Sequence, residues 1–298
     1  MPLTLTGVFA PLATPFDDAD QLDVRRWRVA LQHWIATPLT GFVVLGTNGE
    51  AGAVDEREAD AVVGEARAII PGARPLIVGA GRESTVGTID AVRRAAALGA
   101  DAVLVRTPSL FKSQMTSDAL IRHYTSVADV SPVPVLLYNF TALTGVNLAP
   151  SAVAALAAHP NIVGMKESGS DLAQISDLVT MTPPSFAVLA GSASTFYAAL
   201  SAGAVGGILA LAGLLPEQCV ELFTLTRSGQ YEAARDLQRR LLPVARMLST
   251  GYGVPGLKAA LRLCGVDAGV PRRPLSPAPA DAVAALATAL ASFREIHV

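Results

Sequence analysis

Eight short apolar runs recur along the chain, and each ends in small or polar residues. They lie at Gly7–Pro15, Gly41–Thr47, Leu76–Gly81, Asp101–Thr107, Val133–Asn139, Ile162–Ser168, Phe186–Ser192 and Ala204–Leu211. Segments with apolar residues at helical spacing separate several of them, at Asp55–Ile70, Thr85–Leu98, Ser117–Val130, Pro150–Ala158 and Asp171–Val179. Strand and helix alternating eight times are typical of a parallel barrel, so the pattern predicts an α/β protein with a (β/α)8 TIM barrel. A doubly wound open sheet would usually show a glycine-rich loop after its first strand, and the segment Val8–Leu12 has no glycine.

The strand pattern stops after the eighth run. Helical spacing continues at Pro216–Arg227, Tyr231–Leu248, Gly256–Cys264 and Ala280–Glu295. The first of these segments can close the barrel. We therefore expect a barrel over residues 1–228 that carries the active site, followed by a C-terminal helical segment over residues 229–298.

Composition limits the classes of partner. The 298 residues are 51% hydrophobic and 16% charged, with a formal net charge of −2, which gives no electrostatic case for nucleic acid or an anionic membrane. The uncharged stretch Gly191–Pro216 is interrupted by glycines and serines, so it predicts short buried elements and not a membrane span. Cys219 and Cys264 are isolated, and residues 1–16 lack Lys and Arg, so we expect a cytoplasmic protein without a signal or transit peptide.

Lys166 stands at the end of the sixth apolar run. The chain has three lysines against twenty arginines, so a lysine here suggests a task that arginine cannot perform. That task is to lose a proton and attack a carbonyl group. Taken alone, a lysine at a strand end is more simply a cation whose stem lies on apolar surface.

Other polar residues end neighbouring runs. Thr47 ends the second run and Asn48 follows it, Tyr138 is the last residue but one of the fifth run, and Gly191 is the last but one of the seventh. Each has a plainer interpretation, because turns favour Thr-Asn-Gly sequences and tyrosines are common at strand ends. In a parallel barrel the carboxyl ends of all strands meet at one mouth, so these residues are expected together. An amine, a phenol and a carboxylate-binding turn at one mouth suit imine chemistry on a 2-oxo acid.

Other chemistries find little support in the sequence. The four histidines are scattered without metal-binding spacing, and neither cysteine ends an apolar run. No phosphate-binding loop or GxSxG motif is present. We therefore expect no metal and no cofactor besides the covalent imine on Lys166.

At these residues the chain resembles the pyruvate-dependent class I aldolases of the dihydrodipicolinate synthase and N-acetylneuraminate lyase family. Gly46–Glu50 matches the carboxylate-binding loop of that family, Tyr138-Asn139 its tyrosine, and Ile162–Ser168 its lysine strand. The resemblance implies a homotetramer built from dimers, with an imine on Lys166 and proton transfer by Tyr138. It also implies a substrate carboxylate bound by Thr47 and Asn48, in a pocket lined by Ser168, Gly191 and Ile208.

Within the family the chain is most similar to 4-hydroxy-2-oxoglutarate aldolases, over Ser117–Val130, His159–Gly169, Val188–Ser192, Gly203–Gly207 and Val254–Lys258. This similarity implies cleavage of a 4-hydroxy-2-oxo acid, namely 4-hydroxy-2-oxoglutarate, to pyruvate and glyoxylate. The alternatives are a dihydrodipicolinate synthase and a lyase for sialate or a 2-keto-3-deoxy sugar acid. A different class is a catalytically weak protein that binds 2-oxo acids.

Three positions depart from the pattern of the family. Leu143 stands where the synthases usually carry an arginine for the carboxylate of the incoming aldehyde, which counts against a synthase. The loop containing Phe111 lacks the tyrosine that family members often lend to a neighbouring subunit. Arg106 stands where an apolar residue is expected. It would bind a second substrate carboxylate or, as alternation along the strand favours, pair with an acidic residue outside the barrel.

Overall fold

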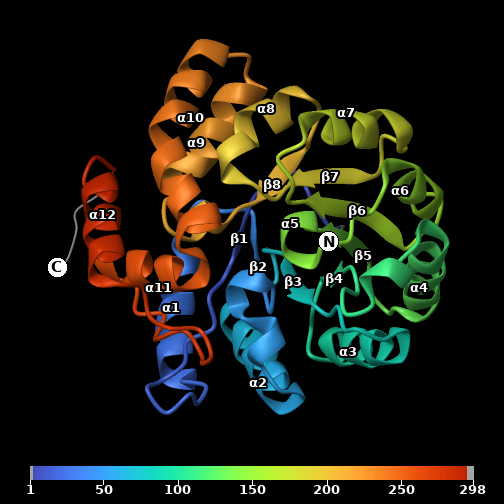
Figure 1. Cartoon of the computed structure of the whole chain (residues 1–298), viewed down its shortest axis with the longest axis horizontal. Helices are drawn as coiled ribbons and strands as arrows, with labels where there is room; N and C mark the ends of the chain where they lie inside the picture. The colour runs from blue at the N-terminus through green and yellow to red at the C-terminus, as the bar shows by residue number, and fades with distance from the viewer. Residues whose placement is uncertain (1–2, 294–298) are drawn as a thin grey trace.

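Eight parallel strands close into a barrel in the computed structural model, which describes residues 3–293 (Figure 1). The strands are β1 (Gly7–Pro11), β2 (Gly41–Val44), β3 (Leu76–Gly79), β4 (Ala102–Arg106), β5 (Val135–Asn139), β6 (Ile162–Glu167), β7 (Ala187–Ala190) and β8 (Gly206–Ile208). Each strand pairs with the next, and β1 pairs with β8 to close the ring. The predicted TIM barrel is confirmed, and every strand lies within its predicted apolar run.

Helices surround the ring between successive strands. They are α1 (Val24–Ile35), α2 (Glu56–Ile69), α3 (Thr85–Ala97), α4 (Ser117–Val130), the short α5 (Thr141–Thr144), α6 (Pro150–Leu156), α7 (Leu172–Met181) and α8 (Phe196–Ser201). Helices α1, α5 and α8 were not predicted, although α1 buries Trp27, Leu31 and Trp34 on one face and is capped by Asp23. Four charged or imidazole side chains in α1, Arg25, Arg26, Arg28 and His33, weaken the periodic pattern of apolar residues from which a helix is predicted.

Four further helices follow β8. They are α9 (Pro216–Arg227), α10 (Tyr231–Arg246), α11 (Gly253–Leu263) and α12 (Ala280–Leu290), and they gather on one side of the ring in Figure 1. Helix α11 begins three residues earlier than predicted, and the predicted end of the last helix at Glu295 lies outside the described residues. Leu241, Leu257 and Leu286 belong to the same apolar cluster as Trp34, so these helices share the core that surrounds the barrel.

Side chains along each strand alternate between two apolar layers. On β4, Ala102 and Leu104 belong to the cluster inside the ring, whereas Val103 and Val105 pack against the helices. The inner layer is apolar. Polar side chains that face the inside of the barrel therefore lie at the ends of the strands.

The uncharged stretch Gly191–Pro216 is divided among α8, β8 and short turns, as the sequence analysis predicts. Among residues 3–293, no helix has both the length and the apolar character that crossing a membrane requires.

Arg272, in the segment between α11 and α12, binds Glu58 in the first turn of α2. Its guanidinium donates hydrogen bonds of 2.5 and 2.6 Å to the carboxylate of Glu58 and lies 4.0 Å from the centre of the Phe16 ring. Hydrogen bonds from Arg272 hold the pKa of Glu58 below its ordinary value, against the opposing effect of burial.

We expect Arg272→Met to lower the free energy of unfolding at pH 7 by about 2 kcal/mol, since a carboxylate loses two charge-assisted hydrogen bonds. A carboxylate with a lowered pKa contributes stability above its unfolded pKa and loses it as the pH falls. The difference between the variant and the parent should therefore narrow below about pH 4, without vanishing, because packing on Phe16 does not depend on pH. Urea denaturation of both proteins at several pH values measures this difference in the free energy of unfolding.

Arg273→Met is the matched control. Arg273 also pairs with a carboxylate, that of Asp20, but its side chain is 74% exposed. The loss should be small at every pH, because exposed ion pairs contribute little. An equal loss in both variants would contradict the importance assigned to Arg272.

Candidate active site

Tyr138 and Lys166 lie side by side at the carboxyl ends of β5 and β6. The two residues are paired in the strand register, and the Lys166 Nζ atom lies 4.5 Å from the centre of the Tyr138 ring. Both side chains belong to the inner face of the barrel and are almost fully buried, with Tyr138 3% and Lys166 6% exposed. The structure therefore brings the predicted amine and phenol into contact in an apolar setting.

A break in the register of β5 and β6 creates this pairing. Val135 pairs with Ile162, but Leu136 pairs with Gly164, so Val163 is an extra residue in β6. Without it, the residue opposite Tyr138 would be Met165, whose side chain packs outside the ring. Since a shift of one residue reverses the face of every side chain beyond it, the bulge brings Lys166 inside.

Thr47 joins this pair from the loop after β2. Its Oγ1 atom lies 3.0 Å from the Tyr138 hydroxyl, within hydrogen-bond distance. Thr47 and Asn48 are half-buried in a short 3₁₀ turn, Thr47–Gly49. The Tyr138 side chain therefore contacts the Lys166 amine through its ring and the Thr47 hydroxyl through its oxygen.

The turn containing Thr47 is bounded by two strained residues. Leu45 before it has φ of 54° and Glu50 after it has φ of 53°, in the left-handed region. Such a conformation costs about 1–2 kcal/mol for a residue with a side chain. Tertiary contacts must therefore hold this turn, and one is the hydrogen bond of 2.8 Å from Thr14 Oγ1 to the Gly49 carbonyl.

Ser168 and Gly191 lie against each other at the ends of β6 and β7. A Cβ atom on Gly191 would lie 2.0 Å from Ser168 Oγ, so only glycine fits there. The Ser168 hydroxyl oxygen is buried and has no hydrogen-bond partner among the described residues. It is therefore available to a ligand. Ile208, fully buried in β8, belongs to the same inner cluster as Tyr138.

A polar network that the sequence analysis missed lies behind the two strands. Glu167 is 1% exposed, and its carboxylate accepts hydrogen bonds from Asn139 Nδ2 at 2.7 Å, Gln174 Nε2 at 2.8 Å and the Gly169 N–H at 2.6 Å. Asn139 and Glu167 directly follow Tyr138 and Lys166, and they are also paired in the register. Asn139 and Glu167 occupy positions that face the helices, where apolar residues are usual. Polar residues at such positions must have hydrogen-bond partners, so they could have indicated this network.

Arg106 pairs with an acidic residue, as predicted, but it belongs to the inward-facing series of β4 and not to the outer one. It is nevertheless engaged within the protein: its guanidinium donates to Glu83 Oε1 at 2.8 Å and to Ser109 Oγ at 3.0 Å. Burial raises the pKa of Glu83, but the bonds from Arg106 and the N–H groups of Leu110 and Ser109 outweigh it and lower that pKa. Arg106 therefore orders the loop after β4.

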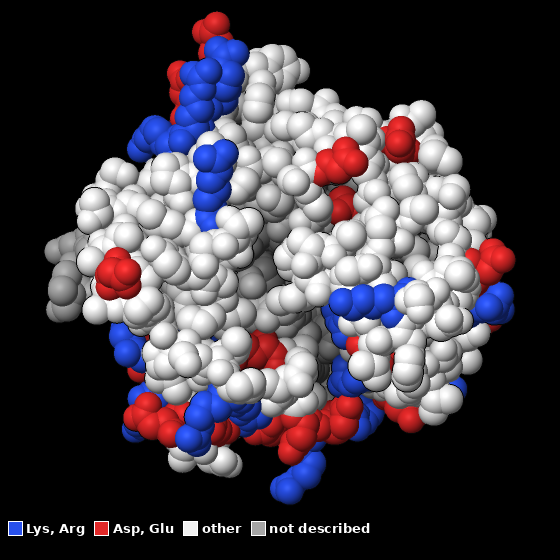
Figure 2. All heavy atoms as spheres, in the orientation of Figure 1, with Lys and Arg blue, Asp and Glu red and all other residues white. Residues whose placement is uncertain are grey.

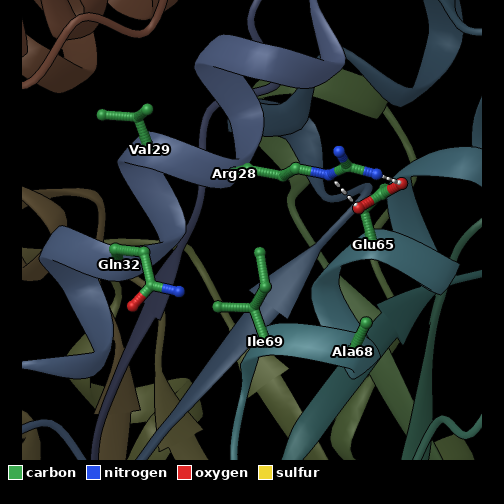
Figure 3. Close-up of a pocket in the computed structure, with 6 residues that line it drawn as sticks. All are labelled: Arg28, Val29, Gln32, Glu65, Ala68 and Ile69. Carbon is green, nitrogen blue, oxygen red and sulfur yellow. Dashed lines mark hydrogen bonds and ion pairs between the residues drawn. The ribbon is translucent and has the colours of Figure 1, made fainter.

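Other surfaces offer less chemistry. A groove between α1 and α2 is spanned by Arg28 and Glu65, whose side chains pair at 2.6 Å, and is otherwise lined mainly by apolar groups (Figure 3). It lies outside the ring, between two helices. Residues 3–293 contain no group of three or more His, Cys, Asp or Glu side chains that could hold a metal ion. Figure 2 shows a central hollow with mostly uncharged surroundings and charged groups mainly toward the periphery.

Comparison with known proteins extends over nearly the whole chain. Residues 4–292 match the model of the Dihydrodipicolinate synthetase family. The chain is 36% identical over 292 residues to a 4-hydroxy-tetrahydrodipicolinate synthase of Exiguobacterium sp., covering 98% of this chain and 99% of that protein. It is 34% identical over 296 residues to a probable mitochondrial 4-hydroxy-2-oxoglutarate aldolase of Emericella nidulans, covering 98% and 96%.

A solved structure agrees with these relatives. It is a prophage protein from E. coli K12 that belongs to the dihydrodipicolinic acid synthase family and was crystallised in complex with pyruvate. The two structures superpose with a TM-score of 0.91 at 29% identity, over 98% of this chain and 99% of the other.

We expect Gly191→Ala to lower the free energy of unfolding by about 1–3 kcal/mol, because the added methyl group collides with Ser168 and must displace it. Chemical denaturation measures this loss. Gly64→Ala is the control, since a Cβ there meets nothing within 4 Å. It should stabilise α2 by about 0.5–1 kcal/mol. A Gly191→Ala variant as stable as the parent would show that Ser168 and Gly191 are not in close contact.

Proposed function

The chain belongs to the Dihydrodipicolinate synthetase family, and on this premise we propose that it is a lyase that forms an imine between Lys166 and a 2-oxo acid. The observation that carries the proposal is the buried Lys166 amine, which lies 4.5 Å from the ring of a tyrosine whose hydroxyl contacts Thr47. An amine enclosed beside a proton carrier suits addition to a carbonyl group and loss of water.

The first steps form the imine. The Lys166 nitrogen bonds to the C2 carbonyl carbon, and the carbonyl oxygen takes up protons and leaves as water. Tyr138 passes these protons, and its hydroxyl is oriented for this by Thr47 at 3.0 Å. Thr47 and Asn48 bind the C1 carboxylate through the turn after β2, and Ser168, Gly191 and Ile208 line the remainder of the pocket.

The next steps break a carbon–carbon bond. Tyr138 removes the proton of the C4 hydroxyl, and the C3–C4 bond breaks. Its electron pair forms the C2=C3 double bond while the C=N pair of the protonated imine moves to nitrogen, which gives an enamine. The C4 fragment leaves as an aldehyde. Protonation of C3 regenerates the imine, and water then releases pyruvate and restores the Lys166 amine.

We further propose 4-hydroxy-2-oxoglutarate as the substrate, with glyoxylate as the aldehyde product. Two points support it: the sequence similarity to an aldolase named for this substrate in Emericella nidulans, and Leu143. Leu143, 53% exposed on α5, stands where the synthases usually carry an arginine, which counts against a synthase. In the cell, we propose that the enzyme works in the cytoplasm as a homotetramer built from dimers.

A second candidate is the condensation of pyruvate with aspartate semialdehyde. Its support is the relative in Exiguobacterium sp., which is named a 4-hydroxy-tetrahydrodipicolinate synthase and is 36% identical over nearly its whole length. Both reactions share the imine on Lys166 and differ in the second substrate. Lyases for sialate or 2-keto-3-deoxy sugar acids share it as well, whereas a mere binding protein would form the imine without turnover.

We expect Lys166→Arg to fold and to form no adduct. After incubation with pyruvate and borohydride, mass spectrometry of the parent should show one reduced pyruvate adduct, on Lys166, and the variant should show none, because a guanidinium does not form an imine. Adduct on Lys112 or Lys258 would contradict the assignment. Tyr138→Phe is the matched comparison: it should still be trapped on Lys166 but turn over about 10²–10⁴-fold more slowly.

A panel of substrates should distinguish the reactions. The expected result is release of glyoxylate from 4-hydroxy-2-oxoglutarate at a kcat/KM well above that for condensation with aspartate semialdehyde, because at Leu143 the chain lacks the arginine that the synthases usually carry. Measurement of both rates on one preparation decides between them. Faster condensation would identify a synthase, and adduct formation without turnover of any substrate would identify a binding protein.

A further inference from the structure

Lys258, in α11, is buried against the loop that contains Thr47. Its Nζ atom lies 2.6 Å from Glu50 Oε1 and donates hydrogen bonds of 2.7 Å to the carbonyl oxygens of Thr14 and Val270. The side chains of Lys258 and Glu50 are each only 2% exposed. The ammonium group thus donates two hydrogen bonds to backbone carbonyls and pairs electrostatically with the Glu50 carboxylate.

Glu50 is fixed from a second side. Its other carboxylate oxygen accepts a hydrogen bond of 2.8 Å from the backbone N–H of Arg272, in the segment after α11. Glu50 directly follows the Thr47–Gly49 turn and has the left-handed φ of 53°. The C-terminal helical segment thus determines where this turn ends, while Tyr138 contacts its first residue.

A buried ion pair is a poor source of stability, because removing two charges from water offsets most of their attraction. Its geometry is demanding, however, since any displacement leaves a charged group without a partner. Apolar residues of similar volume can often replace such a pair at little cost in stability. The pair is therefore better suited to fixing the position of the turn than to strengthening the fold.

We propose that Lys258 and Glu50 are positioning residues that hold the Thr47–Gly49 turn in the conformation that receives the carboxylate of the 2-oxo acid. This inference rests on the proposed function, because it assumes that the turn binds that carboxylate. Neither residue touches the reacting atoms. The C-terminal helical segment, through Lys258, then contributes to substrate affinity at the barrel mouth.

The test uses Glu50→Gln, Lys258→Met and the double variant, each in the full-length protein and each checked by circular dichroism. Trapping with borohydride over a range of pyruvate concentrations gives the concentration for half-maximal adduct on Lys166. We expect it to rise about tenfold or more in each single variant, since small displacements of a binding group weaken binding strongly. Adduct at saturating pyruvate should remain complete. The double variant should be no worse than either single variant, because the two residues act as one unit.

Arg74→Met is the control for a loss of stability alone. Arg74 is a partly buried cation that donates hydrogen bonds to the carbonyl oxygens of Ile35, Thr37 and Leu39, before β2 and thus at the opposite end of that strand from the turn. This variant should be less stable but require the same pyruvate concentration as the parent.

Three results would overturn the inference. One is an unchanged half-maximal concentration in folded Glu50→Gln, which would make the pair structural only. Another is complete loss of adduct in a folded variant, which would place the pair in imine formation itself. The third is an equal rise in Arg74→Met. If Lys258→Met fails to fold, the nearly isosteric Glu50→Gln decides. Absence of adduct in the parent would instead refute the proposed function.

Discussion

The one-residue bulge in β6 is the constraint on which the site depends. Parallel pairing in a closed ring fixes which side chains meet, and the extra residue Val163 changes that pairing so that Lys166 lies opposite Tyr138. The bulge also determines the face, because side chains alternate along a strand. A lysine on the outer face of β6 would pack among the helices. On the inner face, its amine lies over the phenol ring and is shielded from solvent.

Buried polar groups hold the surrounding strand ends. Behind β5 and β6, Asn139 and Glu167 bond to each other, and further amides complete the set. Beside β2, the ion pair of Glu50 and Lys258 holds the turn after the strand. Buried charges like these cost free energy unless their partners are in place. Both groups therefore favour one conformation of the strand ends at the mouth of the barrel.

The loop after β4 is held by an ion pair that is only partly buried. Arg106 is directed by alternation toward the inside of the barrel, but Glu83 and Ser109 engage its guanidinium. Exposed Leu110 and Phe111 follow on the same loop. Arg106 is therefore already paired within the protein. The neighbouring helix α5 adds an apolar residue, Leu143.

Local patterns in the chain were enough to predict the barrel, its eight strands and most of its helices, because apolar periodicity reflects burial directly. The rule that parallel strands end at one mouth was enough to bring Lys166, Tyr138 and Thr47 together. Only the tertiary structure decided the face of Arg106, the bulge at Val163, and the partners of Glu50 and Glu167. These depend on strand register and on contacts between segments far apart in the chain, and neither leaves a periodic trace in the sequence.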